Sequence, residues 1–440
     1  MAVTEAVRKP NVLGHARRSA VVVFFVFMLL HQTDKLLIGP LQTPIMDTFH
    51  MTYTQWGLIN TGALIVGAVC YPLWGWLNDK YHRGKILALA SLIWGSTTWI
   101  SAIAPTFPVF LVTRSSTGID DSSYAGMFSL LADYFSPKAR GKIYGFLQLT
   151  QPIGYLLGMI LALFLAGAIG WRAVFYFTGS LGIILAIVIF FLVKEQPRGS
   201  GEEELEGVET SSYQFSWKTA AQLFVKRSMI LIFLQGFFGV FPWNVITYYF
   251  FGYLQTERGY SADTQFMIMA PAVIFLALGY PLGGFLGDWM FKRTKSGRMI
   301  VGTFGVFMGL VLLWITMNIP ASNALLFAIL LMATALFMPL ASPNVLSTMY
   351  DISLPEIRST ANSIESFVES IGAATAPLIA GAIADAYSVG SAILWICTVA
   401  WGLCFLFFIG AVILVPHDID TLHAQLRERA ELEKAKQEPA

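Results

Sequence analysis

Three ionisable side chains lie at the end of an apolar stretch near the N-terminus. The segment "SAVVVFFVFMLL" runs directly into "HQTDKLLIG", which contains His31, Asp34 and Lys35. A charge at the centre of a bilayer costs about 2.5–3.5 kcal/mol even on lenient insertion scales. We therefore expect these side chains to face protein or a water-filled cavity, where charged groups in a membrane segment usually have a function.

A second set of ionisable groups lies in "RSSTGIDDSSYAG". Arg114, Gly118 and Asp121 stand at positions i, i+4 and i+7, which places them on one face of a helix. Their spacing puts the guanidinium and the carboxylate about 10 Å apart along one wall. Asp120 is rotated about 100° away and is expected to face a neighbouring helix. With Asp34 from another helix, two carboxylates then have access to one arginine.

This combination suits proton coupling. An acid that loses its arginine partner becomes easier to protonate, whereas Arg114 itself stays charged. Our hypothesis is that Asp34 and Asp121 bind and release protons and that Arg114 switches between them. The alternative is a static network of buried ion pairs that fixes helix packing. His31, one turn before Asp34, either relays protons or serves as a hydrogen-bonding residue of a cavity.

The second half of the chain contains a pair of acids in an apolar run. "ANSIESFVES" places Asn362, Glu365 and Glu369 on one helical face. Two acids four residues apart repel each other, so at least one is expected to be protonated or paired. The pair would bind a cationic head group, carry a second proton or pair with a basic residue. The alternative is a hydrated, structural position near the cytoplasmic mouth.

Other polar and aromatic side chains interrupt apolar faces and are candidates for lining a substrate cavity. Aromatic residues in such helices more often serve packing or interfacial belts. The candidates are Tyr124, Gln148, Gln151, Trp243 and Asn244.

The elements that position these residues follow from composition. The chain of 440 residues is 56% hydrophobic and 12% charged, whereas a soluble domain has about 25% charged residues. A bilayer core needs about 20 apolar residues per helix. An all-α membrane protein with twelve transmembrane helices is predicted. The first six spans cover 19–39, 54–77, 85–104, 108–133, 141–165 and 172–193. The second six cover 228–254, 263–289, 299–318, 323–349, 358–385 and 391–415.

Basic residues predict the orientation. Of the 28 lysines and arginines, 24 fall in the tails, in the linker or in the loops that follow even-numbered spans. The positive-inside rule therefore places both termini and the linker in the cytoplasm, in a multi-pass protein of the cell membrane. The predicted parts are a tail (1–18), a six-helix bundle (19–193), a linker with a surface helix (194–227), a second bundle (228–415) and a C-terminal tail (416–440).

The two halves repeat one another. "GWLNDKYHRGK" follows the second span and "GGFLGDWMFKR" the eighth, so Gly75 and Asp79 recur as Gly284 and Asp288, 209 residues later. In the same way "DYFSPKARGK" matches "DISLPEIRST", so Arg140 recurs as Arg358. Two six-helix repeats with a central site are the architecture of many secondary transporters.

Twelve spans, the six-plus-six repeat and the loop at Gly75–Lys85 resemble the major facilitator superfamily. In that family the aspartate and arginine of this loop are thought to latch the halves together on the cytoplasmic side. The resemblance implies this role for Asp79 and Arg83, with Gly75, Arg140, Asp288 and Arg358 belonging to the same cytoplasmic gate. The alternative is a turn with solvated charges.

A narrower resemblance is to the spinster-like branch of the family. It is carried by "RSSTGIDDSSYAGMFSLLADYF", "QPIGYLLG" and "KEQPRG". Members of this branch export lysolipids and related amphipathic molecules, and several are thought to be proton-driven. The chain departs from the pattern because Asp120 replaces a glycine, Asp121 a glutamate and Ser122 an alanine.

Several function classes are disfavoured. The net charge of +1 gives no electrostatic basis for binding nucleic acid. No nucleophile–base motif, metal cluster or P-loop pattern occurs, so neither an enzyme nor a cofactor or metal site is expected. The 25-residue polar linker is too short for the folded domain that a transporter-derived receptor usually adds.

A proton-coupled transporter of an amphipathic small molecule such as a lysolipid or drug is predicted instead. Its expected partners are the substrate, protons and membrane lipids, and the resemblance implies a monomer. The alternative is a symporter of organic or sugar-acid anions, in which Arg114 binds the substrate carboxylate. A basic residue in the wall of the second-half cavity would favour the anion, whereas apolar residues with the Glu365–Glu369 pair favour an amphiphile or a cation.

Overall fold

The computed structural model describes residues 10–121, 123–135, 143, 146, 147, 149–195, 226–353 and 358–437. Within these helices, the side chains of 10–17, Pro72, Gly75, Asp79, Ala125, Ser129, Ala132, Asp133, 358–360, Ser363 and 426–437 are not described. All regular secondary structure in the described residues is helical. The chain divides into two compact units, Met1–Thr210 and Ser211–Ala440.

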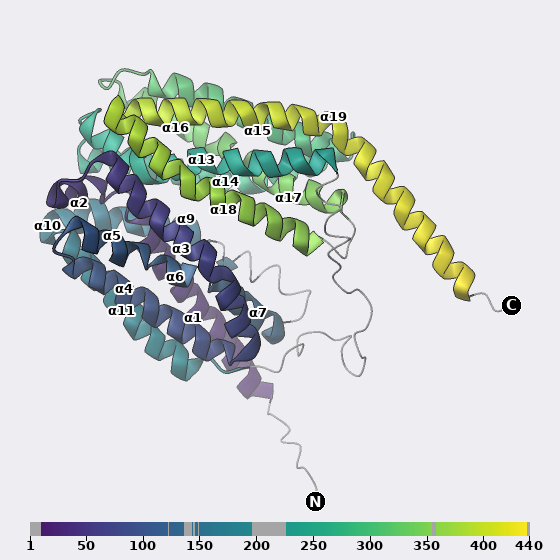
Figure 1. Ribbon diagram of the computed structural model, residues 1–440, viewed down its shortest axis with the longest axis horizontal. Coiled ribbons are helices and arrows are strands. Elements are labelled where there is room, and N and C mark those ends of the chain that lie inside the picture. The colour runs from purple at the N-terminus through teal and green to yellow at the C-terminus, as the bar shows by residue number, and fades with distance from the viewer. Residues whose placement is uncertain are drawn as a thin grey trace, which may run out of the picture. The chain divides into compact units, whose positions relative to one another are not determined.

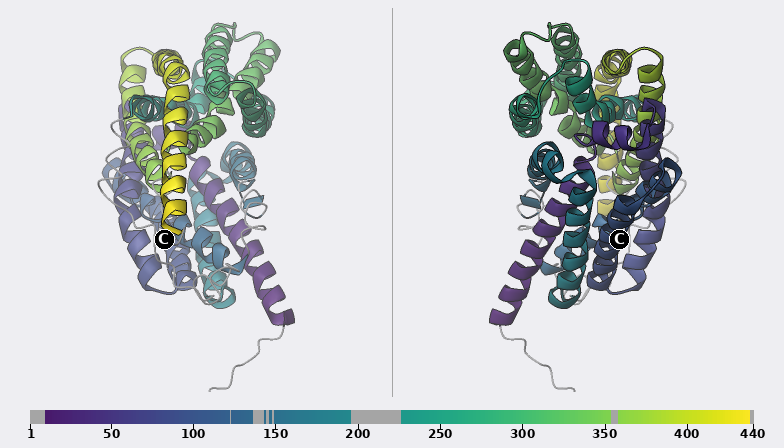
Figure 2. Two further views of the ribbon diagram at one scale, coloured as in Figure 1. Left: turned by 90° about the vertical axis from the view of Figure 1, so that its right-hand side faces the viewer. Right: turned by 90° about the vertical axis from the view of Figure 1, so that its left-hand side faces the viewer.

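The described part of the first unit is built from the helices of the predicted spans, with a short additional helix, α2, after the first of them (Figure 1). The N-terminal turns of the first helix project from the unit (Figure 2). The elements are α1 (Pro10–Leu36), α2 (Gln42–Phe49), α3 (Tyr53–Lys80), α4 (Arg83–Ile103), α5 (Phe107–Ser115), α6 (Gly118–Asp121), α7 (Tyr124–Tyr134), α9 (Thr150–Ile160), the π-turn η1 (Leu161–Leu165), α10 (Ala166–Ile169) and α11 (Trp171–Leu192).

The second unit repeats the six-span pattern. Its last helix continues from the final predicted span into the charged C-terminal segment (Figures 1 and 2). The elements are α13 (Arg227–Thr256), α14 (Ala262–Phe291), α15 (Gly297–Met317), α16 (Ala324–Phe337), the 3₁₀ turn η4 (Met338–Leu340), α17 (Ala341–Asp351), α18 (Arg358–Ala386) and α19 (Val389–Gln437).

The helices match the predicted membrane spans. Ten of them, counted over the described residues, are long and apolar enough to cross a membrane. The second predicted span corresponds to α3, which has 28 residues. The fourth corresponds to α5, α6 and α7, and the tenth is likewise divided by η4.

The fourth span is not the continuous helix that the spacing of Arg114 and Asp121 predicted. Helix α5 ends at Ser115 and α6 begins at Gly118. At the break, the hydroxyl of Ser116 donates to the Thr113 carbonyl at 2.6 Å, and that of Thr117 donates to the Arg114 carbonyl at 2.7 Å. Local hydrogen bonds of this kind compete with the helical ladder.

A side chain from the neighbouring helix α3 also contributes at this break. The Trp74 indole N–H donates to the carbonyl of Ile119 in α6. Close contact is possible because Gly118 has no side chain: the backbone carbonyl of Ala63 occupies the place of a Cβ. The break therefore depends on packing against α3 as well as on the local sequence.

An asparagine–glycine pair joins the second and fourth spans of each unit. In the first unit, Asn78 Oδ1 of α3 occupies the place of a Cβ on Gly126 of α7. In the second unit the roles are reversed, because Asn344 of α17 lies against Gly287 of α14. Gly287 follows Asn78 by the same 209 residues that separate the repeated loop motifs. The two units thus contain the same asparagine–glycine contact, with the two residue types on opposite spans.

Small residues also position α1. Cβ atoms on Gly154 and Gly158 of α9 would lie 3.1 Å from the amide nitrogen and 3.0 Å from the carbonyl oxygen of Thr33, respectively. This is the close approach that a small-xxx-small pattern permits. The segment of α1 with His31, Asp34 and Lys35 is therefore fixed against α9.

Candidate functional site

Asp34 lies in a buried pocket of hydrogen-bond donors. Its Oδ2 accepts from the Trp94 indole at 3.0 Å and from the Thr98 hydroxyl at 3.1 Å. Its Oδ1 accepts from the Thr178 hydroxyl at 2.6 Å. The residue is 2% exposed, and its donors come from α4 and α11. Hydrogen bonds to an ionised acceptor are stronger than neutral ones, so this site stabilises a carboxylate.

Arg114 lies beside Asp34, but the distance between them is too long for a hydrogen bond. Its Nη1 is 3.8 Å from Asp34 Oδ2, and its guanidinium lies 5.3 Å from the centre of the Phe175 ring. Arg114 is 6% exposed. Nη1 has no hydrogen-bond acceptor among the described residues. One donor nitrogen is thus left with the capacity to bind a further acceptor.

Asp121 has different partners from those that the sequence suggested. Its Oδ2 is 3.0 Å from Lys35 Nζ, and its Oδ1 is 3.8 Å from His31 Nε2. In the described part of the chain, no ion pair joins Asp121 to Arg114. The break between α5 and α6 removes the common helical face on which the predicted pairing depended.

Asp120 forms a short acid–base contact with His31. Its Oδ2 lies 2.6 Å from His31 Nε2, and the Tyr124 hydroxyl hydrogen-bonds to His31 Nδ1. Asp120 Oδ1 has no hydrogen-bond partner within the described residues. Asp120 thus faces a neighbouring helix, as predicted, and that helix is α1.

These residues form one cluster that we call the acid–base cluster: His31, Asp34, Lys35, Arg114, Asp120 and Asp121. Three carboxylates face two cationic side chains, a lysine and an arginine. One proton, on His31 or shared between His31 and Asp120, makes the net charge of the cluster zero. Buried charges are stable only when they are paired, so the cluster is suited to bind one proton and release it.

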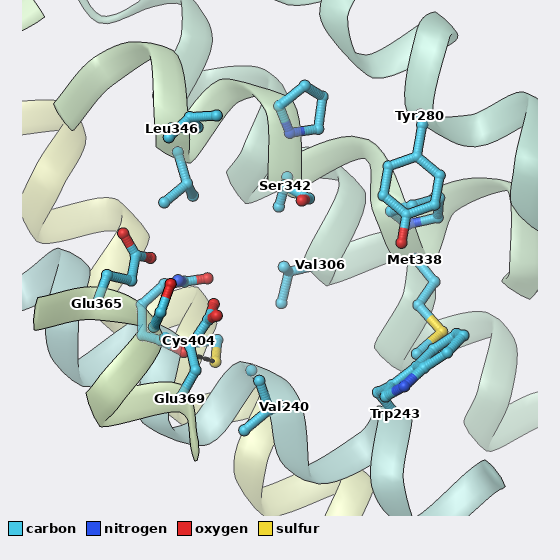
Figure 3. Close-up of a pocket in the computed structure, with 18 of the residues that line it drawn as sticks. Val240, Trp243, Tyr280, Val306, Met338, Ser342, Leu346, Glu365, Glu369 and Cys404 are labelled. Atoms are coloured by element: carbon cyan, nitrogen blue, oxygen red, sulfur yellow. Dashed lines mark hydrogen bonds between the residues drawn. The ribbon is translucent and has the colours of Figure 1, made fainter. Parts of the chain in front are cut away.

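The second unit contains a cavity of about 390 Å³, lined by residues of α13, α14, α15, η4, α17, α18 and α19 (Figure 3). Four predicted site residues line it: Trp243, Asn362, Glu365 and Glu369. Glu365 is 5% exposed, and its Oε2 has no hydrogen-bond partner in the described structure. Among the described residues, those that line this cavity include no lysine, arginine or histidine.

The profile described as Major Facilitator Superfamily matches residues 23–326. The chain belongs to this superfamily. It is therefore a multi-pass membrane transporter and not an enzyme. The predicted fold of two six-helix repeats is confirmed.

Similar proteins include members of the spinster group. Over 386 residues the chain is 25% identical to Protein spinster of Drosophila melanogaster. The alignment covers 85% of this chain and 63% of the relative. It is 26% identical over 394 residues to the cis,cis-muconate transport protein of Acinetobacter baylyi, with 87% and 91% covered. The crystal structure of a bacterial homologue of the human lysosomal transporter Spinster, inward-facing and unoccupied, matches with a TM-score of 0.77 at 18% identity, over 94% of this chain and 98% of that one.

The predicted cytoplasmic gate of this transporter is described only in part. Arg83 Nε lies 2.7 Å from Glu195 Oε1, and Arg298 Nη2 lies 2.7 Å from Asp288 Oδ1. Arg140 and the side chains of Gly75, Asp79 and Arg358 lie outside the described residues. The latch therefore stays a prediction. Glu195 belongs to "KEQPRG", so a sequence signal for a partner of Arg83 was present.

Asn244, Gln151 and Gln148 are the other residues predicted to line a substrate cavity. Asn244 is buried, and its amide donates to the Val240 carbonyl of its own helix at 2.8 Å. Gln151 is half-buried on α9, and Gln148 lies outside the described residues. A substrate role for these three residues stays a prediction.

Proposed function

We propose that this protein is a secondary active, proton-coupled transporter that moves an amphipathic small molecule, such as a lysolipid or a drug-like compound, by alternating access. The distribution of basic residues supports a position in the cell membrane with both termini and the linker in the cytoplasm.

The contact between His31 and Asp120 within the acid–base cluster carries the proposal of proton coupling. A 2.6 Å hydrogen bond between an imidazole and a carboxyl, both buried, is a place where a proton can be held between a base and an acid. Ionisable groups inside membrane segments mark proton relays and ion pathways in many transporters.

The proposed coupling step uses Asp34 and Asp121 as proton acceptors and Arg114 as the switch. A proton on Asp34 removes the charge that attracts Arg114 and releases the guanidinium from its 3.8 Å pairing. A proton on Asp121 in turn releases Lys35. Proton binding thus changes the ion pairs within the first unit, and a substrate or a conformational change responds to that difference.

Two observations support an amphipathic substrate. The cavity of the second unit combines apolar walls with two carboxyl groups, and its described lining residues include no basic side chain. The chain is also similar to spinster proteins over 85% of its length.

A second candidate is an organic or sugar-acid anion. It is supported by the similarity to a muconate transport protein and by Arg114 Nη1, which has no acceptor among the described residues. In that case Arg114 binds the substrate carboxylate directly.

Substrate-induced thermal stabilisation of the purified protein separates the two candidates. Lysolipids and amphipathic drugs raise the melting temperature if the first proposal holds, whereas sugar acids and dicarboxylates alone raise it if the second holds. Uptake of the stabilising compound into proteoliposomes, with and without a pH gradient, then tests proton coupling. Equal uptake rates under both conditions would exclude it.

A further inference from the structure

The cavity of the second unit contains acidic groups, and no cationic side chain is found among its described lining residues. Glu365 and Glu369 lie one helical turn apart on α18 and line the cavity together. Glu365 Oε2 is buried and has no partner in the described residues. A buried, unpaired carboxylate is costly, so it is neutralised either by a proton or by a bound positive charge.

The opposite side of the cavity is aromatic. Trp243 and Tyr280 lie across from the two glutamates, with Val240 and Val306 between the two ends (Figure 3). The volume of about 390 Å³ lies within the range of small-molecule sites, which are mostly apolar with a few polar groups. A ligand that matches both ends has a positively charged group and an apolar body.

Gly236 of α13 makes space for the two carboxyl groups. A Cβ atom at this position would lie 3.3 Å from Glu365 Oε1 and 3.4 Å from Glu369 Cγ. At this position α13 faces the acidic pair with a residue that has no side chain. Other titratable groups that line the cavity are Tyr280 from α14 and Cys404 from α19, and neither carries a positive charge.

We propose that this cavity binds the charged group of an amphipathic organic cation at Glu365 and Glu369, and that protons compete with the cation for these carboxyl groups. The inference rests on the proposed function, because it specifies the chemical class of the amphipathic substrate. Binding of one cation to a protonated glutamate releases one proton, so charge is balanced in the exchange.

A matched pair of probes tests the inference. Tetraphenylphosphonium and tetraphenylborate have nearly the same size and shape but opposite charge. Binding of each to the purified full-length protein is measured by titration calorimetry in detergent at several pH values. We expect the cation to bind at least tenfold more tightly than the anion, to bind more weakly as the pH falls, and to release protons on binding.

Variants locate the site. Glu365→Gln weakens cation binding at least tenfold, and Glu365→Gln combined with Glu369→Gln abolishes both the preference for the cation and the proton release. Asp263→Asn removes an exposed carboxyl at the start of α14, outside the cavity, and leaves binding unchanged. The melting temperature of each variant shows whether it is folded.

Two results would overturn the inference: equal binding of the two probes to the wild-type protein, or wild-type cation binding by the folded double variant. Binding in detergent needs no gradient, so this test is separate from that of the proposed function. If cation binding is found but a pH gradient drives no uptake, proton coupling fails while the cation site stands.

Discussion

His31 Nε2 lies 2.6 Å from Asp120 Oδ2, and the spacing of residues in the fourth span did not predict this pair. Asp120 stands where the spinster-like pattern has a glycine, and His31 lies one turn before Asp34 on α1. The contact adds an acid and a base to the coupling residues Asp34, Asp121 and Arg114 that the spacing in the sequence predicts. Substitution of His31 is therefore expected to affect transport independently of Asp34 and Arg114.

Replacement of His31 by glutamine is expected to lower pH-gradient-driven uptake about tenfold or more, because general acid–base groups typically contribute 10²–10⁴-fold to proton-transfer steps. Glutamine keeps hydrogen-bonding capacity but cannot carry the proton. The measurement is the pH profile of uptake in proteoliposomes. A variant with an unchanged profile would assign His31 to packing alone, as in the alternative of a cavity residue.

Removal of the Thr178 hydroxyl is expected to destabilise the first unit. The hydroxyl donates to Asp34 Oδ1 at 2.6 Å in a buried position. Thr178→Val leaves the carboxylate with one donor fewer at a cost of about 1–3 kcal/mol. The variant should unfold at lower temperature than wild type, while Thr178→Ser, which keeps the hydroxyl, should remain close to wild type. Equal melting temperatures for the two variants would show that the hydrogen bond is not stabilising.

The asparagine–glycine contact of the first unit can be converted by mutation to the arrangement found in the second unit. Gly126→Ala places a methyl group where Asn78 Oδ1 lies and should cost about 1–3 kcal/mol, the usual penalty for overpacking. The double variant Asn78→Gly with Gly126→Asn reproduces the arrangement of Gly287 and Asn344 and should recover part of that loss. A double variant less stable than Gly126→Ala would mean that the two units are not equivalent at this contact. Thermal unfolding in detergent provides the comparison.

Gly236→Ala tests the space beside the acidic pair of the second unit. The new Cβ lies 3.3 Å from Glu365 Oε1, closer than ordinary van der Waals contact, so the carboxyl groups must shift. Cation binding should weaken severalfold, because a misplaced charged group loses part of its electrostatic contact with the ligand. Gly167→Ala in α10 is a matched control, because a Cβ there meets no atom within 4 Å. Equal effects of the two substitutions on binding would contradict the proposed position of the ligand.

Composition and repeats predicted the architecture well, because apolar runs of span length and a loop motif that recurs 209 residues later are direct properties of the sequence. The proximity of Asp34 and Arg114 also agrees with the geometry, although their role is a proposal. The Glu365–Glu369 pair lies at a cavity because both residues share one face of α18.

The partner of Asp121 could not be predicted, since it depends on the break at Ser116 and Thr117. Both residues are compatible with a helix, and the break also involves the Trp74 hydrogen bond from a different helix. A local pattern carries no information on such a tertiary contact. Because of the break, Asp121 lies beside Lys35 and not on the face of Arg114.

The most direct test of the central claim is transport by Asp34→Asn in proteoliposomes, with and without a pH gradient. Asparagine keeps the shape of the side chain and can still accept hydrogen bonds, but it cannot bind or release a proton. We expect gradient-driven accumulation to be lost, while exchange of substrate across the membrane without a gradient continues. Accumulation by the variant at the wild-type rate and with the wild-type proton stoichiometry would contradict this expectation.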